Sequence, residues 1–271
     1  MLTRLAIAPR SDRDLRDFGD ERDARFLSPE WLETRGQVFL RTALASMKRQ
    51  TVSPDFWLIA VDERVEPYLN FLVAKLPPYA KWVVLGQDDL FPEVVRRQIS
   101  HLPRDVLTIR LDSDDQLDPL FLARTARYSR PNFAINFPHG AQYFFATGIV
   151  VHRWIKSNPT VGFRAVNNDM TVHDFGNHSN VGRAARTISI PTWNPMWVKG
   201  SHEANHVYFQ PNGIPVMYPR KSLSRFELSQ YREAGNFETK MRTLISFLGF
   251  RLNKRWPALS RRLEDWRKRS S

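Results

Sequence analysis

The sequence predicts an α/β protein with a doubly wound, mostly parallel central sheet, helices on both of its faces, and a helical extension at the C-terminus. Three observations lead to this fold class. Apolar runs alternate with helical patterns through the first two-fifths of the chain, as in β-α-β units. The 271 residues, 42% of them hydrophobic, suffice for one large domain with a core. Residues 236–271 return to a helical pattern after a middle segment of short strand-like runs.

The first half of the chain supplies four strands and three helices. Strands are predicted from short apolar runs at Leu5–Ala8, Phe56–Val61, Trp82–Leu85 and Val106–Leu111. The first helix begins at Ser28-Pro29, because Ser is a favoured cap and Pro fits the first turn, and its apolar face extends to Met47. Further helices are expected near residues 67–76 and 92–101.

The middle of the chain, from about Asn132 to Pro219, is rich in Asn, His, Pro, Gly and aromatic residues. Its β-like runs at 133–137, 143–152 and 185–190 predict antiparallel strands joined by long loops. We therefore expect one domain over residues 1–235, with halves at about 1–125 and about 130–220, followed by the extension at 236–271.

Composition excludes several classes of protein. There is no cysteine, so disulfides, thiolate chemistry and Cys-ligated zinc are absent. The apolar stretch near the N-terminus is too short for a signal peptide, and no run approaches the roughly 20 apolar residues of a membrane span. These observations predict a cytoplasmic protein.

The formal net charge of +12 is concentrated at the C-terminus, where residues 251–271 hold eight Arg or Lys against Glu264 and Asp265. A stripe of Leu and Trp at helical spacing lies opposite these cations. One interpretation is a basic amphipathic helix that attaches the protein peripherally to the anionic inner face of the cytoplasmic membrane. The other is a terminal helix docked on the domain with solvated cations. Nucleic acid is not an expected partner, since the sequence contains no recognisable nucleic-acid-binding module.

The most informative pattern is a group of carboxylates at the end of a predicted strand. Val106–Leu111 is followed by Asp112, Asp114 and Asp115, and then by Asp118-Pro119. Asp118 has the features of a helix cap. The other three repel one another unless they are solvated or bind a cation, and hard cations such as Mg²⁺ or Mn²⁺ prefer oxygen ligands. A divalent ion at a strand end commonly carries a substrate diphosphate.

Three blocks in this order resemble the nucleotide-sugar domain of family-2-type glycosyltransferases of the GT-A fold. They are RTALASMKRQT at 41–51, FWLIAVD at 56–62 and LDSDD at 111–115. A narrower resemblance is to the rhamnosyltransferase family of bacterial polysaccharide synthesis. It rests on Thr3-Arg4, WLETR at 31–35, the aspartate block and WVKGSHEAN at 197–205.

The resemblance implies a role for several residues. Asp62, Asp112 and Arg4 would bind the nucleotide, and Asp114, Asp115 and His202 would bind Mn²⁺ or Mg²⁺. The metal would neutralise the nucleoside diphosphate that leaves the sugar. The implied activity is inverting, metal-dependent transfer of a sugar, rhamnose in the narrower match. The donor would be a dTDP- or UDP-sugar, and the acceptor a surface polysaccharide or glycolipid.

An inverting transferase also needs a base that takes the proton of the acceptor hydroxyl. Such enzymes use an Asp or Glu from the second half of the domain. Asp169, Asp174 and Glu203 are the candidates, and the sequence does not decide between them. Arg96 and Arg97 could reach phosphate oxygens or be solvated helix residues. Aromatic residues of the middle segment could stack on a sugar ring or belong to the core: Tyr143, Phe144, Phe145, Trp193 and Trp197.

Two other functions compete with the transferase. His202-Glu203-x-x-His206 matches the zinc-protease motif, which would make the chain a zinc-dependent hydrolase. That chemistry needs both histidines on one helix, whereas Gly200-Ser201 precede the motif and a strand-like run follows it. A non-catalytic protein that binds membrane surfaces or polyanions through the basic tail is the third possibility, but it leaves the aspartate cluster unexplained.

Overall fold

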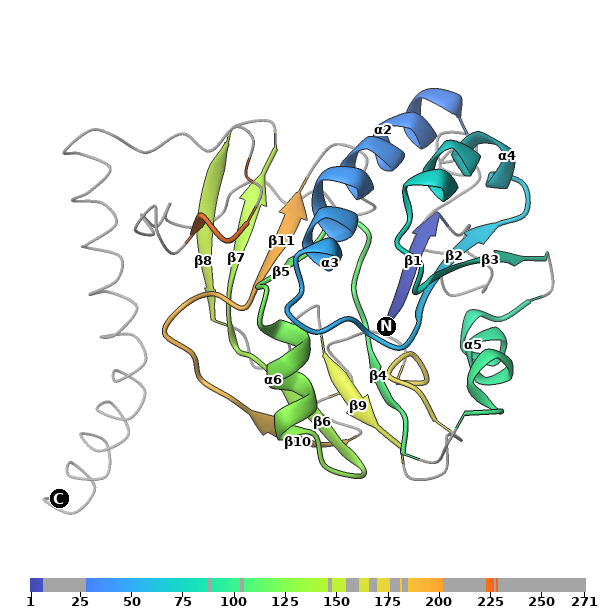
Figure 1. The fold of residues 1–271 in the computed structure, drawn as a ribbon. Coiled ribbons are helices and arrows are strands. Elements are labelled where there is room, and N and C mark those ends of the chain that lie inside the picture. The colour runs from blue at the N-terminus through green and yellow to red at the C-terminus, as the bar shows by residue number, and fades with distance from the viewer. Residues whose placement is uncertain are drawn as a thin grey trace, which may run out of the picture.

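Figure 1 shows the chain in a computed structural model. The structure describes residues 1–6, 28–86, 89–102, 105–145, 148–154, 161–165, 170–175, 181, 185–201, 223–226 and 228. The predicted C-terminal extension at 236–271 lies outside the described residues. Among the residues that are described, no helix is long and apolar enough to cross a membrane.

A three-stranded parallel sheet forms the N-terminal part of the fold. Its strands are β1 (Leu2–Ala6), β2 (Trp57–Asp62) and β3 (Ala80–Leu85), with β2 in the centre. Every residue of β2 is buried. A central parallel strand is buried in this way when helices cover both faces of its sheet.

Helices do pack on both faces of β2. Successive side chains of a strand point to opposite faces, so its odd- and even-numbered residues belong to different clusters. Trp57, Ile59 and Val61 pack in the cluster that includes residues of α2 (Pro29–Phe39), α4 (Glu66–Leu69) and the 3₁₀ helix η2 (Asn70–Lys75). Leu58 and Ala60 pack in the cluster that includes Phe91, Val94 and Val95 of α5 (Phe91–Ile99).

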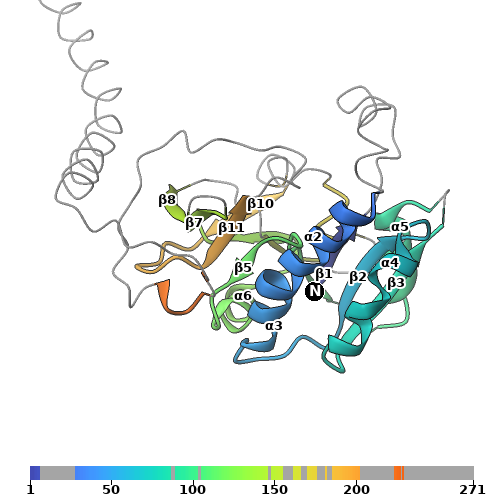
Figure 2. The ribbon, with the colours of Figure 1, turned by 90° about the horizontal axis from the view of Figure 1, so that it is seen from above.

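The first helix is longer than one α-helical segment. The Ser28 hydroxyl accepts a hydrogen bond from the Trp31 amide over 3.3 Å, which confirms the predicted cap. From α2 the chain continues through a π-helical turn, η1 (Leu40–Leu44), into α3 (Ala45–Lys48), with right-handed helical backbone at both junctions. Figure 2 shows this helix running alongside β1 and β5. π-Helical turns inside α-helices are frequent near functional sites.

A second, mixed sheet continues from the first. Its order is β10 (Arg186–Ser189), β6 (Phe133–Asn136), β9 (Gly162–Arg164) and β4 (Leu107–Ile109). β9 is antiparallel to both neighbours, whereas β10 and β6 are parallel. A parallel bridge between Leu2 and Arg110 joins β1 to the residue that follows β4. The chain beyond β4 therefore emerges beside β1.

The third sheet contains β5 (Gln116–Leu117), β11 (Trp197–Ser201), β7 (His139–Phe144) and β8 (Ile149–Trp154), in that order. The helix α6 (Phe121–Tyr128) follows β5. The run at 143–152, which the sequence presents as one segment, is divided by a turn between β7 and β8. Gly148 in that turn has a φ of 68°, a backbone conformation that glycine adopts without strain.

The α/β class is confirmed. The parallel three-stranded unit is consistent with a Rossmann-like fold. A doubly wound sheet of GT-A type stays a prediction, because the second and third sheets contain antiparallel strand pairs.

Candidate functional site

The predicted carboxylates lie where the parallel strands end. Asp62 is the last residue of β2. Because Arg110 pairs with Leu2, the chain reaches Asp112 at about the level of Arg4 on β1. With neighbouring strands about 4.8 Å apart, β2 and the segment beyond β4 are separated by roughly 10 Å across β1. Open α/β sheets bind their ligands at this edge.

The turn at residues 112–115 is held by groups from the long helix. The Arg35 guanidinium is buried, donating to the Leu5 carbonyl over 3.1 Å and to the Ser113 hydroxyl over 2.7 Å. The Thr42 hydroxyl, in the π-helical turn, lies 3.0 Å from the Ser113 carbonyl that accepts from it. These contacts connect α2 and η1 to the middle of the aspartate turn.

Strand β11 holds the same turn from the other side. The Gly200 amide donates to Asp115 Oδ1 over 3.1 Å. A Cβ at position 200 would lie only 2.2 Å from the Asp114 carbonyl oxygen. Only glycine allows this approach, so residue 200 is part of the framework of the turn.

Asp115 is the most unusual carboxylate of the turn. Its side chain is 1% exposed, and its Oδ2 atom has no hydrogen-bond partner. Burial, and then the charges of Asp114 and Asp112, raise the pKa of Asp115 well above its ordinary value, against the opposing Lys199 ammonium and Gly200 amide. A buried, unsatisfied oxygen beside two further carboxylates has the chemistry of a cation ligand.

The two carboxylates expected at the nucleotide are each bonded to an arginine two residues away. Asp62 is buried and accepts 3.0 Å bonds from Arg64 Nε and Nη2. Asp112 accepts from Arg110 Nε over 2.9 Å and from its Nη2 over 3.4 Å. The strand ends thus hold two Asp–Arg pairs, each offering both an acceptor and a cation.

The loop that follows the turn is fixed by the end of the long helix. Gln50 donates from Nε2 to the Asp118 carbonyl over 2.9 Å and accepts at Oε1 from the Leu122 amide over 3.1 Å. The Thr51 amide donates to the Pro119 carbonyl over 2.9 Å. Asp118 Oδ1 accepts from the Leu120 amide, so Asp118 caps the turn that leads into α6. The residues Gln50-Thr51 therefore position the segment that carries the aspartates.

Comparison with known proteins identifies the family. A family model described as "Putative rhamnosyl transferase" matches residues 5–211. The chain belongs to this family. No curated protein sequence matches. Among solved structures, HddC from Yersinia pseudotuberculosis matches at 8% identity, with 73% of this chain and 92% of that chain covered and a TM-score of 0.32.

Membership of the rhamnosyl transferase family supports a glycosyltransferase activity. The matched range includes Asp62, the aspartate turn and Gly200. It also includes residues 202–206, which contain the zinc-protease pattern and the predicted ligand His202. These residues lie outside the described part of the chain, so the His202 and zinc hypotheses are untested.

Of the three candidate bases in this rhamnosyl transferase family member, only Asp174 is described; Asp169 and Glu203 lie outside the described residues. Asp174 accepts bonds from the amide and hydroxyl of Thr171, over 2.6 and 2.9 Å, and forms an ion pair with Arg96. Its carboxylate therefore caps a turn and fixes α5. Arg97, the other arginine that the sequence suggested as a phosphate ligand, is bonded to Asp89 over 2.7 Å.

His173 is a site residue to which the sequence pattern assigns no role. It is buried, its Nε2 has no hydrogen-bond partner, and the Phe91 ring contacts it edge-on at 4.7 Å. Burial, followed by the charges of Arg110 and Arg4, lowers its pKa well below the ordinary value. His173 is therefore a neutral imidazole among the charged groups at the end of β4. Its presence in a polar segment, residues 171–174, is the only signal that the sequence offers.

The aromatic residues of the middle segment divide into two groups. Tyr143, Phe144 and Trp197 are buried, and the Trp197 indole donates to the Phe137 carbonyl over 2.8 Å. They belong to the core. Phe145 is half-buried, and Trp193 is 99% exposed. Among the five, Trp193 has the exposure that a sugar-stacking residue requires.

Proposed function

We propose that this chain transfers a sugar, rhamnose by analogy with the family description, from a nucleoside-diphosphate donor to a glycan or glycolipid acceptor. The donor diphosphate would lie at the aspartate turn, residues 112–115. The single observation that carries the proposal is Asp115, whose buried and unpartnered Oδ2 lies beside two further carboxylates in a turn fixed by Arg35, Thr42 and Gly200.

The donor set of the turn suits a hard divalent cation. Asp114 and Asp115 would hold Mn²⁺ or Mg²⁺ through carboxylate oxygens. No group of three His, Cys, Asp or Glu residues converges within the described part of the chain. Two carboxylates together with substrate phosphates are a usual arrangement for Mg²⁺, and His202 is the proposed further ligand. A cation bound there would supply Lewis-acid stabilisation of the leaving diphosphate.

The Asp–Arg pairs at the strand ends suit the nucleoside part of the donor. The Asp62 and Asp112 carboxylates can accept hydrogen bonds from ribose hydroxyls or a base N–H. Arg4 is exposed on β1 at about the level of Asp112, and its guanidinium would add a cation for the phosphates. Since Asp62 is buried and bonded to Arg64, its orientation is set before the donor binds.

The proposed reaction is a single displacement. The acceptor hydroxyl oxygen forms a bond to the anomeric carbon, and the bond from that carbon to the diphosphate oxygen breaks with its electron pair on the diphosphate. The hydroxyl proton passes to a carboxylate base. Asp169, Asp174 and Glu203 remain the proposed candidates, and the three bonds that already engage Asp174 favour the other two.

The test is isothermal titration of the full chain with dTDP, UDP and GDP, with and without Mn²⁺. We expect one nucleotide to bind only with Mn²⁺, and Asp114→Ala and Asp115→Asn to abolish that binding. Asp105→Asn is a control away from the turn, because the Asp105 side chain is 40% exposed, is paired with Arg164, and has a φ of 72°, which Asn tolerates. Release of the nucleoside diphosphate from the corresponding dTDP- or UDP-sugar should disappear in Asp114→Ala.

Two results would contradict the proposal. One is the absence of manganese-dependent binding for every nucleotide by a correctly folded protein. The other is full turnover in Asp114→Ala. Zinc in the purified protein, lost in His202→Ala, would instead support the hydrolase.

A further inference from the structure

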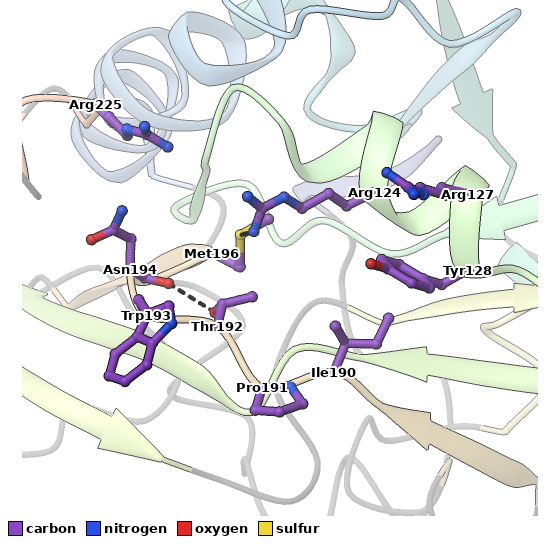
Figure 3. Close-up of a pocket in the computed structure, with 10 residues that line it drawn as sticks. All are labelled: Arg124, Arg127, Tyr128, Ile190, Pro191, Thr192, Trp193, Asn194, Met196 and Arg225. Carbon is purple, nitrogen blue, oxygen red and sulfur yellow. Dashed lines mark hydrogen bonds between the residues drawn. The ribbon is translucent and has the colours of Figure 1, made fainter.

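A second binding feature lies away from the aspartate turn. A pocket of about 360 Å³ opens between α6 and the segment that connects β10 to β11 (Figure 3). Arg124, Arg127 and Tyr128 come from α6, and Trp193 and Met196 come from the connecting segment. Arg225 contributes to the lining from a separate part of the chain. We refer to it as the α6 pocket.

The α6 pocket is strongly basic. None of its lining residues is acidic, and three are arginines. Arg225 is paired with the buried Asp118 carboxylate over 3.0 Å. Arg124 and Arg127 contact uncharged groups. Arg124 Nη1 lies 3.4 Å from Met196 Sδ, and Arg127 Cζ lies 5.8 Å from the centre of the Tyr128 ring. Within the described residues, Arg124 and Arg127 therefore have no carboxylate that neutralises them.

The same pocket presents aromatic surface on a fixed segment. Trp193 is 99% exposed and Tyr128 is 41% exposed. The backbone beside Trp193 is anchored, because the Thr192 hydroxyl donates to the Asn194 carbonyl over 2.8 Å and the Thr192 carbonyl lies 2.8 Å from His139 Nδ1. A fully hydrated indole on an anchored segment is suited to stacking against a flat apolar face, such as that of a sugar ring.

The α6 pocket is connected to the aspartate turn by two structural links. Arg225 is bonded to Asp118, three residues after Asp115. Met196 precedes β11, the strand whose Gly200 amide donates to Asp115. Met196 and Gly200 are four positions apart along extended backbone, which places the pocket about 13 Å from the turn. A distal part of a substrate could therefore occupy the pocket while its reactive end lies at the turn.

We propose that the α6 pocket binds the acceptor through an anionic sugar unit, one that carries a carboxylate or phosphate. This proposal rests on the function proposed above. The guanidinium groups of Arg124 and Arg127 would bind the anion, for which their planar N–H donors are suited. The Trp193 indole would cover the ring of the same or a neighbouring sugar.

The test is titration of the full chain with an oligogalacturonate and with the neutral maltohexaose of similar length. We expect the oligogalacturonate to bind more tightly. Arg124→Gln/Arg127→Gln and Trp193→Ala should each weaken that binding about tenfold, the size expected for losing charge-assisted hydrogen bonds or a stacked aromatic ring. Since the chain has a formal net charge of +12, polyanions will also bind non-specifically, so the difference between variants is the readout.

Matched controls separate the pocket from this general attraction. Arg41→Gln/Lys48→Gln removes the same charge from exposed positions on the long helix. Tyr68→Ala removes an aromatic ring that is 53% exposed on α4. We expect both controls to bind oligogalacturonate as the wild type does. Equal weakening by the pocket and control variants would overturn the proposal.

Two further outcomes are distinguishable. Binding to phosphatidylglycerol vesicles that depends on Arg124 and Arg127, without selective binding of the oligogalacturonate, would assign the pocket to a lipid headgroup and overturn the sugar assignment. Manganese-dependent nucleotide binding is measured on the same variants and should be unchanged. If the wild type binds no nucleotide but the pocket variants still lose oligogalacturonate binding, the proposed transfer fails and the pocket remains a glycan site.

Discussion

The amide of Gly200 donates a hydrogen bond to Asp115 across 85 residues of sequence, with a nitrogen-to-oxygen distance of 3.1 Å. This bond continues the antiparallel pairing of β11 with β5, the strand that directly follows the turn, and so attaches the candidate donor site to the third sheet. It leaves Asp115 Oδ2 as the atom without a partner. The position of β11 therefore sets how the carboxylate is presented.

Gly200→Ala should damage the site without altering any charge. The added Cβ would lie 2.2 Å from the Asp114 carbonyl oxygen, which is backbone and cannot rotate away. We expect a loss of unfolding free energy of about 1–3 kcal/mol, as for other overpacked positions, together with weaker Mn²⁺-dependent nucleotide binding. Urea unfolding and titration would measure these.

Gly86→Ala is the control for that experiment. Gly86 follows β3, and its Cβ would lie 3.4 Å from Asp89 Oδ2, close to ordinary contact with a side-chain atom. Gly86→Ala should lower the free energy of unfolding by less than Gly200→Ala does. If Gly200→Ala has the wild-type free energy of unfolding and the wild-type affinity for the nucleotide, the close approach of β11 to the turn is not essential.

Asp115→Asn should stabilise the metal-free protein at neutral pH. The pKa of Asp115 is raised, so its folded form binds a proton more tightly than its unfolded form. The associated stability is present at acid pH and is lost as pH rises through the folded pKa. Asn keeps an oxygen for the Gly200 amide and removes the buried charge. In EDTA, the stability advantage of the variant should grow as the pH rises above the ordinary range of an Asp carboxyl, which is about pH 4.

In Mn²⁺ the wild type should become more stable than Asp115→Asn, because the ion would bind to and stabilise only the wild type. Thermal unfolding with EDTA or with Mn²⁺ measures both effects. Asp118→Asn is the control: Asp118 is equally buried, but both of its carboxylate oxygens are bonded, to the Leu120 amide and to Arg225. It should destabilise the protein at neutral pH. Stabilisation by both variants would show general relief of negative charge instead of a special property of Asp115.

The sequence predicts local features of this fold well. The Ser28 cap, the strand ending at Asp62 and the group at Asp112–Asp115 follow from short-range patterns, since caps and strand ends are decided by neighbouring residues. The strand at Trp197–Ser201 and the close approach at Gly200 are not among the sequence predictions, although a lone glycine inside a strand is a general signal of such an approach. The partner, the Asp114 carbonyl, lies in a distant part of the sequence, just before the strand β5 that pairs with β11.

Features that depend on tertiary placement could not be predicted. Positions 193 and 197 are both tryptophan. The Trp193 side chain is 99% exposed, whereas the Trp197 side chain is fully buried and packs against the backbone of Gly140. The unpartnered Nε2 of His173 depends on the packing of α5 and the strand end against it. Among the predicted site residues, Asp169, Glu203 and His202 lie outside the described residues, and their roles stay predictions.

Gln50→Ala should loosen the loop that carries the aspartates. Gln50 supplies a donor to the Asp118 carbonyl and an acceptor to the Leu122 amide, and the alanine variant loses both. Leaving such backbone groups unpaired costs about 1–3 kcal/mol. Gln50→Glu keeps the acceptor and loses the donor, so its loss should be intermediate. Gln98→Ala, at an exposed position of α5, should change stability by less than about 0.5 kcal/mol. Equal effects at positions 50 and 98 would exclude this role.

His139 should make the stability of the protein depend on pH. Its Nδ1 lies 2.8 Å from the Thr192 carbonyl, which only accepts, so Nδ1 carries the proton of the neutral ring. Burial lowers the pKa of His139 below 6.5. A histidine with a lowered folded pKa contributes stability above its unfolded pKa and loses it as pH falls through the folded value. The pKa of His173 is also lowered, so the free energy of unfolding should fall as the pH drops below about 6.5, the ordinary pKa of histidine.

His139→Asn isolates one part of this effect, because its side-chain amide can still donate to Thr192 but does not titrate. We expect a shallower fall of unfolding free energy with acid in this variant, whereas His101→Asn, at an exposed position, should follow the wild type. An identical pH profile in the wild type and in His139→Asn would exclude His139 as the titrating group.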